Sequence, residues 1–326
     1  MRVSLFRSSC LLALLIAPPA SAAVTMAWTP IGNLGNACQL SGDAGGGQGC
    51  YGAVSYTYSI GTYDVTNAQY AEFLNAKAAS DPLGLYNTKM SIAGGESFGG
   101  IRRSGSSGSY TYAPIAGREN MPVNWVNFFD ALRFANWLNN GQGNGSTETG
   151  AYTLLGGTPT PSNGATVTRN AGATIFLPSE DEWYKAAYYN AASTSYFAYP
   201  AGSNTQTTCA TPTATANQAN CNRVVDNLTI KGSYTGSASP YGTFDQGGNV
   251  WQWNEAIVTG SFRSIRGGSF IFGPGALATS IRSSDDPTIE ELSIGFRVAP
   301  EPSFRLGLAA SLVTLLGLAG WRRSRA

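Results

Sequence analysis

Apolar residues recur at helical spacing in three short parts of the chain, and each part begins with a residue that can cap a helix. Thr66-x-x-Gln69 has the form of a capping box, and the apolar positions of one helix face follow it. Asn127 precedes a longer amphipathic run, with Asp130 near the positive end of the helix dipole. Ser179-x-x-Glu182 is a second box before a third run. The pattern therefore predicts three helices, which begin after Thr66, Asn127 and Ser179.

Strand-like patterns are short and are separated by long polar segments. Residues 51–63 alternate between apolar and polar side chains, which predicts a strand. Residues 151–155 and 165–169 are predicted to pair as a hairpin, unless the low complexity of residues 139–174 indicates disorder. Residues 190–236 read as a long loop region. Helices and strands do not alternate, so the expected fold class is an irregular α+β domain with few helices, short strands and long loops.

Both ends of the chain have the pattern of targeting segments. Residues 1–22 have a basic start, an apolar centre and the cleavage site Ala20-Ser21-Ala22, which is typical of a secretory signal peptide. Near the other end, Pro300-Glu301-Pro302 precedes an apolar run at 306–321 and an arginine cluster, which predicts a membrane-crossing helix with a cytoplasmic end. Residues 300–326 are similar to a PEP-CTERM sorting signal, which implies processing by an exosortase. A plain tail anchor is the alternative.

These assignments predict an exported protein of the cell envelope or the extracellular space, anchored in the membrane until its C-terminal helix is removed. They also change the charge of the part that remains. The chain has 20 basic and 19 acidic residues. The two segments hold six of the arginines and one glutamate, which leaves residues 23–299 with a net charge of −4. No basic patch stands out, so we expect no nucleic-acid partner.

The cysteines and the missing histidines limit the chemistry of the exported part. Cys10 lies in the signal peptide, and four cysteines remain: Cys38, Cys50, Cys209 and Cys221. An even number in an exported chain favours disulfides, and we favour Cys38–Cys50 and Cys209–Cys221 among the three connectivities. A metal site is the alternative, although no Cys-x-x-Cys pair occurs. The chain has no histidine, which excludes histidine-ligated metals, Ser-His-Asp triads and histidine general bases.

Six short blocks along the chain resemble the formylglycine-generating enzyme (sulfatase-modifying factor) family. The resemblance covers residues 51–299 and implies a compact fold related to C-type lectins, with residues 23–50 as a separate Gly-rich segment. The blocks are Gly61-Thr-Tyr-Asp-Val-Thr-Asn67, Pro122-Val-Asn-Trp125, Leu177-Pro-Ser-Glu-Asp-Glu-Trp183, Tyr241-Gly-Thr-Phe-Asp-Gln-Gly-Gly-Asn-Val-Trp-Gln-Trp253, Arg266-Gly-Gly-Ser-Phe270 and Gly295-Phe-Arg297.

The resemblance implies a calcium site in the loop that precedes Trp253. Its ligands would be the side chains of Asp245 and Gln252, together with the backbone carbonyls of Gln246, Gly248 and Val250. Oxygen donors of these kinds suit calcium. The family usually has Asn where Asp245 stands and Glu where Gln252 stands, so the single carboxylate has changed position. The alternative is a glycine-rich turn before a core strand, with Trp251 and Trp253 as packing residues.

The resemblance does not carry over to the catalytic residues of the oxidases. Those enzymes hold copper with two cysteines shortly after the Gly-Gly-Ser block, and the corresponding positions here are Phe272 and Leu277. A Cu(I) site needs soft ligands, and related sulfoxide synthases use histidine-ligated iron. We therefore expect no copper or iron cofactor and assign no catalytic residue.

Acidic pairs shortly before the last block offer a further possibility. Asp285-Asp286 and Glu290-Glu291 would supply carboxylates for acid and base roles, although such residues more often form a solvated loop. Arg266, Arg282 and Arg297 are expected to be buried and to pair with these acids. The preferred reading is a calcium-stabilised binding module for an exopolysaccharide or an envelope protein. An enzyme of altered chemistry on the same scaffold is the alternative.

Overall fold

The computed structural model describes residues 23–42, 48–91 and 98–301. The predicted signal peptide and sorting helix lie outside these ranges. In the described ranges, no helix has both the length and the apolar character that crossing a membrane requires.

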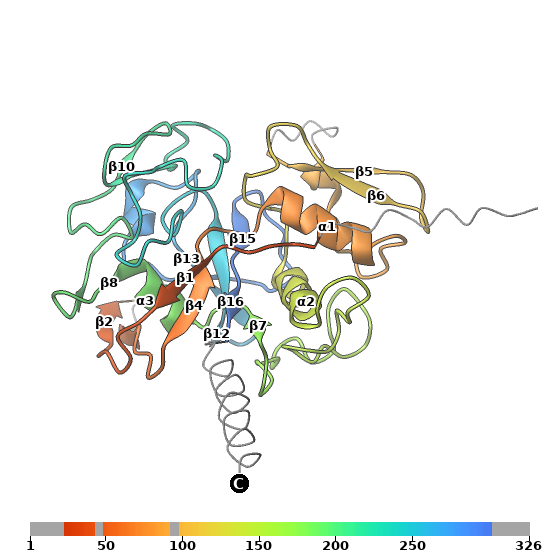
Figure 1. Cartoon of the computed structure of the whole chain (residues 1–326), viewed down its shortest axis with the longest axis horizontal. Helices are drawn as coiled ribbons and strands as arrows, with labels where there is room; N and C mark the ends of the chain where they lie inside the picture. The colour runs from red at the N-terminus through yellow and green to blue at the C-terminus, as the bar shows by residue number, and fades with distance from the viewer. Residues whose placement is uncertain (1–22, 43–47, 92–97, 302–326) are drawn as a thin grey trace, which may run out of the picture.

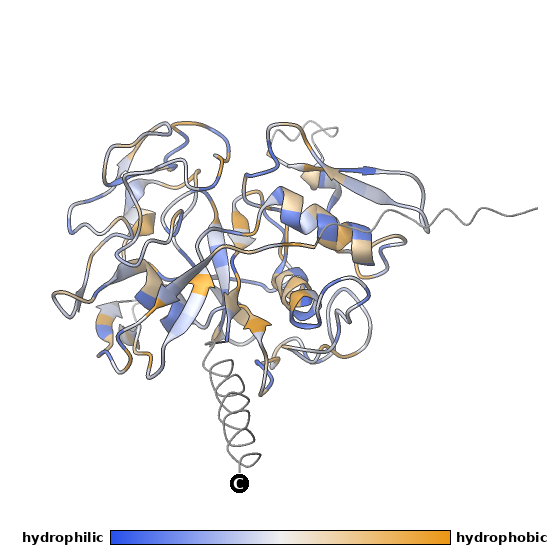
Figure 2. Cartoon of the chain, viewed as in Figure 1, coloured by the Kyte–Doolittle hydropathy of each residue, from blue (hydrophilic) through white to orange (hydrophobic). Residues whose placement is uncertain are grey.

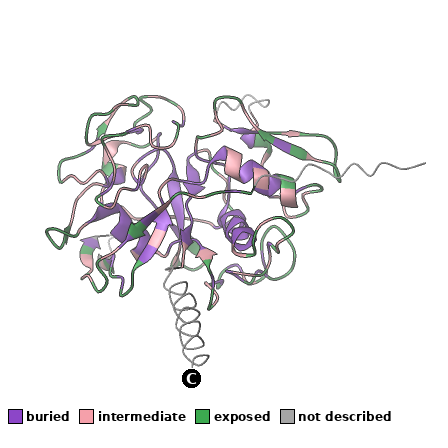
Figure 3. Ribbon diagram, viewed as in Figure 1, coloured by how far each residue is buried: buried purple, intermediate pink, exposed green. Residues whose placement is uncertain are grey.

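All three predicted helices are present, and each begins with a capping box. They are α1 (Asn67–Lys77), α2 (Phe128–Asn139) and α3 (Glu180–Tyr188). Their N-caps are Thr66, Asn127 and Ser179, as the sequence predicts. Helix α2 is buried from its first residue to Leu138, so it forms part of the core rather than a surface layer, as the purple helix in Figure 3 shows.

A four-stranded sheet built from the last third of the chain runs through the middle of the molecule. Its order is β14–β13–β12–β15, with β12 (Trp251–Thr259) antiparallel to β13 (Phe262–Arg266) and parallel to β15 (Ile294–Phe296). Strand β14 (Ser283–Asp285) closes one edge. In Figure 1, helices α1 and α2 lie on one side of these strands, and α3 with the long 190–240 loops lies on the other.

Every other sheet of the described ranges has two strands. Figure 2 shows hydrophobic residues on α1, α2, β4 and β7, interspersed with hydrophilic ones. The fold is therefore the irregular α+β arrangement that the sequence predicts. The remaining pairs are β1 (Trp28–Ile31) with β4 (Tyr58–Gly61), β2 (Gln39–Gly42) with β3 (Gln48–Tyr51), β5 (Ile101–Ser104) with β6 (Thr111–Pro114), β7 (Ile175–Phe176) with β16 (Ala299–Pro300), β8 (Tyr189–Asn190) with β9 (Ser195–Tyr196), and β10 (Thr208–Cys209) with β11 (Gln218–Ala219).

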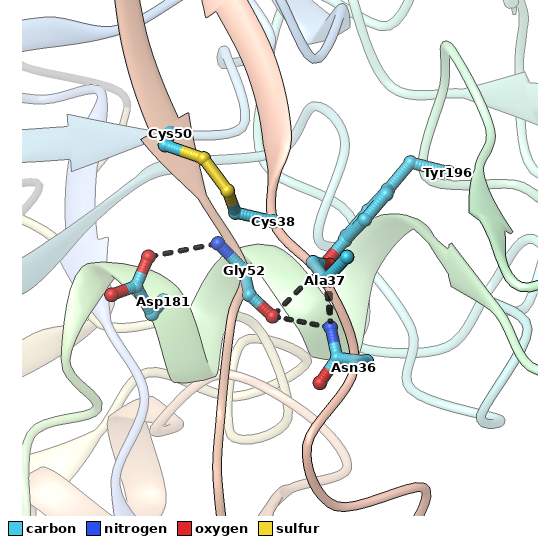
Figure 4. Close-up of a disulfide and its surroundings, with 7 residues drawn as sticks. All are labelled: Asn36, Ala37, Cys38, Cys50, Gly52, Asp181 and Tyr196. Carbon is cyan, nitrogen blue, oxygen red and sulfur yellow. Dashed lines mark hydrogen bonds between the residues drawn. A yellow bond between two sulfur atoms is a disulfide. The ribbon is translucent and has the colours of Figure 1, made fainter.

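The predicted continuous strand at residues 51–63 is wrong, because side chains occupy the backbone groups near its start. Gly52 donates its N–H to Asp181, and its carbonyl accepts hydrogen bonds from Asn36 and Tyr196, as the dashed lines in Figure 4 show. Its φ of +87° also leaves the extended region. Within this segment, Tyr58–Gly61 pairs as β4, and Tyr51 is the last residue of β3.

The predicted hairpin between residues 151–155 and 165–169 is also wrong. These segments meet at one bridge, between Tyr152 and Arg169. The Asn136 side chain of α2 receives the N–H of Tyr152 at 2.7 Å and donates to its carbonyl at 3.1 Å. A buried amide has therefore taken the groups that a longer ladder would use.

The two local disulfides, Cys38–Cys50 and Cys209–Cys221, are both present. The first lies close to the Gly52 hydrogen bonds (Figure 4). Its cysteines are partly or fully exposed. In contrast, Cys221 is completely buried against Leu277 and Ala219. Both pairs have a sequence separation of 12 residues, so they differ in packing rather than in loop length.

We predict that removing the second disulfide destabilises the protein more than removing the first. Chain entropy alone gives about 3 kcal/mol for a loop of this length in either case. The variant C209S/C221S also places a hydroxyl in the apolar cluster around Leu277. Urea unfolding of this variant, with C38S/C50S as the matched control, measures the difference. Equal losses would show that the burial of Cys221 contributes nothing.

Candidate functional site

The loop between Thr243 and Trp251 is shaped by residues in the left-handed backbone region. Asp245, Gly248 and Asn249 have φ values of 58°, 82° and 61°. Glycine is required at 248, because a Cβ there would lie 2.4 Å from the carbonyl oxygen of Asn220. The side chain of Asn249 accepts the N–H of Thr229 and donates to its carbonyl, which holds the loop against the preceding segment.

Asp245 is a half-buried carboxylate at one end of this loop. It accepts the N–H of Gly232 at 2.6 Å. Burial raises the pKa of Asp245 to about 6, against the lowering effects of that hydrogen bond and of Arg297. Asp245 also lines a small polar cavity of about 20 Å³, together with Tyr234, Ser239 and Thr243. A cavity of this size holds one water molecule or one ion.

The Gln252 side chain already makes three hydrogen bonds. Its oxygen accepts hydrogen bonds from Arg297 Nε at 2.7 Å and from Trp183 Nε1 at 2.6 Å, and its amide nitrogen donates to the Asp245 carbonyl at 2.8 Å. Gln252 would therefore coordinate a cation only after releasing one of these donors. In the structure, this amide links the loop to Arg297.

Other donors of the predicted calcium site fit better. The backbone carbonyls of Gln246 and Gly248 accept no backbone hydrogen bond from the described residues. Together with the Asp245 carboxylate, they are free to serve as oxygen ligands. The same ranges hold no cluster of three or more His, Cys, Asp or Glu side chains that could bind a metal. A cation at this loop would therefore depend on backbone carbonyls.

Arg297 connects three segments beneath the loop. It is completely buried, and it donates to the carbonyls of Gly61 at 2.8 Å and Phe244 at 2.9 Å. It also pairs with buried Asp64 at 3.2 Å. Burial raises the pKa of Asp64 even with Arg297 beside it. The sequence places Arg297 correctly in the core, but its acidic partner is Asp64 rather than the pairs at 285–291.

The other two arginines also have a different partner from the one expected. Arg266 and Arg282 both pair with Glu180, the first residue of α3, each at 2.6 Å. Through these two ion pairs, Glu180 fixes the start of α3 against the central sheet. Asp286 instead accepts hydrogen bonds from Thr288 at the surface.

Phe272 and Leu277, at the positions that the resemblance gives to copper thiols, lie in different environments. Phe272 is 44% exposed, and its ring packs edge-on against Trp251 at 5.6 Å between ring centres. Leu277 is completely buried beside Cys221, and its carbonyl accepts a hydrogen bond from Tyr188. Neither side chain has an atom that binds a metal.

Four partly exposed apolar side chains that sequence reasoning did not identify pack on the buried cluster of Leu228, Val250 and Phe270. Phe272 directly follows one of them in the chain, and we call the five together the Phe272 face: Phe98, Met121, Ile271, Phe272 and Leu292. Asn124 ties the edges of this face together by donating to the carbonyls of Phe98 and Leu292.

Two buried polar atoms beside the Phe272 face have no hydrogen-bond partner among the described residues. They are Asn124 Oδ1 and Trp125 Nε1. Trp125 also has a φ of 58°, which is rare for a bulky side chain and is typical of functional or strained positions. The only sequence signal for these residues is the Pro122-Val-Asn-Trp125 block.

The comparisons with known proteins agree with this architecture. Among curated proteins, hercynine oxygenase of Mycolicibacterium smegmatis is 29% identical over 146 residues, or 38% of this chain and 32% of that protein. The enzyme of the same name from Mycobacterium tuberculosis is 28% identical over 142 residues. The chain thus spans about a third of the length of the curated relatives it matches.

Solved structures share the fold at low sequence identity. Treponema denticola variable protein 1 is 18% identical with a TM-score of 0.55, over 87% of this chain and 98% of that one. The protein CarF is 20% identical with a TM-score of 0.56, over 86% and 100%. Residues 52–302 match the family model described as the sulfatase-modifying factor enzyme 1-like domain. The chain therefore belongs to the family of proteins with a sulfatase-modifying factor enzyme 1-like domain.

Proposed function

We propose that this protein is an exported binding module that captures an envelope protein on its Phe272 face. The observation that carries the proposal is the exposed Phe272 ring, packed on Trp251 where the resemblance calls for a metal-binding thiol. An exposed apolar surface of aromatic and aliphatic side chains suits a protein segment that buries it. Two disulfides are compatible with export.

A glycan is the second kind of ligand that this face could take. Aromatic rings pack against sugar rings, and the exopolysaccharide predicted from the sorting tail would supply them. The apolar neighbours Met121, Ile271 and Leu292 favour protein over glycan, because they offer no hydrogen-bonding group to a hydroxyl. The binding experiment below separates the two.

An enzyme of altered chemistry remains the alternative function. The similarity to hercynine oxygenase favours this alternative, although the similarity extends over only 146 residues. Against it, the chain has no histidine, and all four cysteines outside the signal peptide are in disulfides. No replacement set of three metal-binding side chains occurs in the described ranges.

Calcium is proposed as a stabilising ligand of the loop at Asp245. The carboxylate and the carbonyls of Gln246, Gly248 and Val250 would hold it, and water would complete the coordination. The role is structural: a bound cation would offset the charge of Asp245 and fix the strand β12 that carries Trp251. Gln252 keeps its hydrogen bonds to Arg297 and Trp183 in this arrangement.

We predict that Phe272→Ser weakens binding to envelope protein at least tenfold. Removing the ring removes the exposed contact together with its edge-on packing against Trp251. Phe262→Ser is the matched control, because Phe262 is 40% exposed at the other end of the sheet, at the β12–β13 turn. Surface plasmon resonance with immobilised envelope proteins and, separately, purified exopolysaccharide measures both. Equal loss in the two variants, or binding to the polysaccharide alone, would contradict the proposal.

We also predict that calcium raises the melting temperature above pH 6. At 100 times the dissociation constant, the gain of about 2.7 kcal/mol corresponds to roughly 5–10 °C for a domain of this size. The gain should fade below pH 6, because protonated Asp245 no longer binds a cation. Asp245→Asn should abolish it, and Asp286→Asn should not. A calcium-independent melting temperature across this pH range would remove the calcium site.

A further inference from the structure

Three segments far apart in the sequence meet at the start of α2, where two carboxyl groups bind the same residue, Asn127. Asn87 caps the short 3-10 helix Thr88–Met90, Asn127 and Asp130 begin α2, and Glu290 lies in the turn before β15. Asp130 is completely buried, and Glu290 is half-buried. The sequence indicated Asp130 only as a capping residue and Glu290 only as one of four loop acids.

Both oxygens of Glu290 are bound by amide groups whose orientation is fixed. Asn87 Nδ2 and Asn127 Nδ2 donate to the two oxygens of Glu290. The oxygens of these amides accept the N–H groups of Lys89 and Asp130, as N-caps do. Their NH₂ groups must therefore face Glu290, and the arrangement leaves no amide donor for Asp130.

Asp130 has one satisfied and one unsatisfied oxygen. Its Oδ2 accepts the N–H of Asn127 at 3.1 Å. Its Oδ1 is buried and has no donor among the described residues. The Glu290 carboxyl is held at the same place, because Asn127 Nδ2 donates to its Oε1 at 3.3 Å. Two ionised carboxylates bound to one residue repel each other, and a proton on one of them would remove that repulsion.

We propose that Asp130 and Glu290 share one proton at neutral pH, and that this proton fastens the 286–291 turn to the start of α2. The bound proton supplies the one donor that the site lacks. The proposal does not depend on the binding function above.

The charged groups around the pair support a retained proton. Burial raises the pKa of Asp130, and the neighbouring Glu290 raises it further. Burial also raises the pKa of Glu290. Asp81 acts in the same direction on both. Buried Tyr70 faces the pair as a neutral group, its own pKa raised by burial and by both acids.

The nearby cations do not neutralise the pair. Arg133 lowers the pKa of Asp130, but its guanidinium is held by Glu148 at 2.8 and 3.2 Å and by the carbonyls of Thr158 and Pro159. Lys89 lies over the Trp125 ring at 4.6 Å. Neither forms an ion pair with Asp130 or Glu290 in the described ranges. If both acids were ionised, the second negative charge would therefore be uncompensated.

The turn that the proton fastens also supports the Phe272 face. The N–H groups of Trp125 and Phe128 donate to the carbonyls of Glu291 and Pro287. Leu292 and Ser293 follow directly, and the Ser293 carbonyl receives the N–H of Trp251 at 2.8 Å. Loss of the proton would place two like charges in contact and loosen this turn beneath Leu292 and Trp251.

The proposal fixes the sign of a pH effect. In the unfolded chain, both acids ionise near pH 4. In the folded protein, one proton stays bound to a higher pH, so the contribution to stability is complete below about pH 4 and is lost as the pH rises toward the raised pKa. Within that window, each rise of one pH unit lowers the folding equilibrium constant by up to tenfold.

Urea unfolding of the full chain between pH 5 and 9, with a chelator present, tests this proposal. Glu290→Gln and Asp130→Asn each replace the shared proton by an amide N–H of the same shape. In both variants, the free energy of unfolding is expected to depend less steeply on pH than in the unsubstituted protein, by an amount that corresponds to up to one bound proton. The control Asp286→Asn lies on the same turn, where Asp286 accepts hydrogen bonds from Thr288, and it should keep the original slope.

A second readout covers variants that fold poorly. Infrared difference spectra of the unsubstituted protein against either variant at pH 7 should show the carbonyl band of a protonated carboxylic acid. An unchanged pH slope in Glu290→Gln, or no acid band, would overturn the proposal. Stabilisation by calcium at pH 8 that Glu290→Gln abolishes would do so too, because it would assign the site to a bridging cation.

Discussion

The fold depends on buried guanidinium groups that bind backbone carbonyls. Regular sheets satisfy their own polar groups, but this chain has long loops whose carbonyls must be satisfied by other means. Arg133, Arg263, Arg266 and Arg297 are completely buried and donate to carbonyls of Thr158, Val167, Ile281 and Gly61, among others. Arg297 is the central case, because it ties the first strand pair, the 244–252 loop and the last strand together. Each planar guanidinium offers five donors, which suits several carbonyls at once.

The residues that stabilise the scaffold through these buried hydrogen bonds are different from the residues that form the exposed candidate site. The arginines, Glu180 and Gln252 hold the central sheet and lie beneath the surface. The surface residues Phe272, Ile271 and Leu292 make no such contacts, so they can change without loss of the fold. Leu277, in contrast, belongs to the buried cluster beside Cys221. The Phe272 face is apolar, partly exposed and bordered by the polar groups of Asn124 and Trp125.

Local features of the structure could be predicted from the sequence, and long-range ones could not. Each of the three capping boxes spans only four residues, so the sequence alone predicts the helices that begin after Thr66, Asn127 and Ser179. The two disulfides follow from equal short spacings. Arg266 binds Glu180, 86 residues away, and Glu290 binds Asn127, 163 residues away, and no spacing rule indicates these partners. The failed hairpin has the same origin, because Asn136, outside both segments, captures the backbone of Tyr152.

The central claim is that the scaffold is retained and the oxidase chemistry is lost. Oxygen consumption by the purified protein, loaded with copper and supplied with a cysteine-containing sulfatase peptide, tests it most directly. Uptake is expected to equal that of a protein-free copper control, because the described residues offer neither a free thiol nor an imidazole to hold the metal. Oxygen uptake above the control, with conversion of the peptide cysteine, would contradict it.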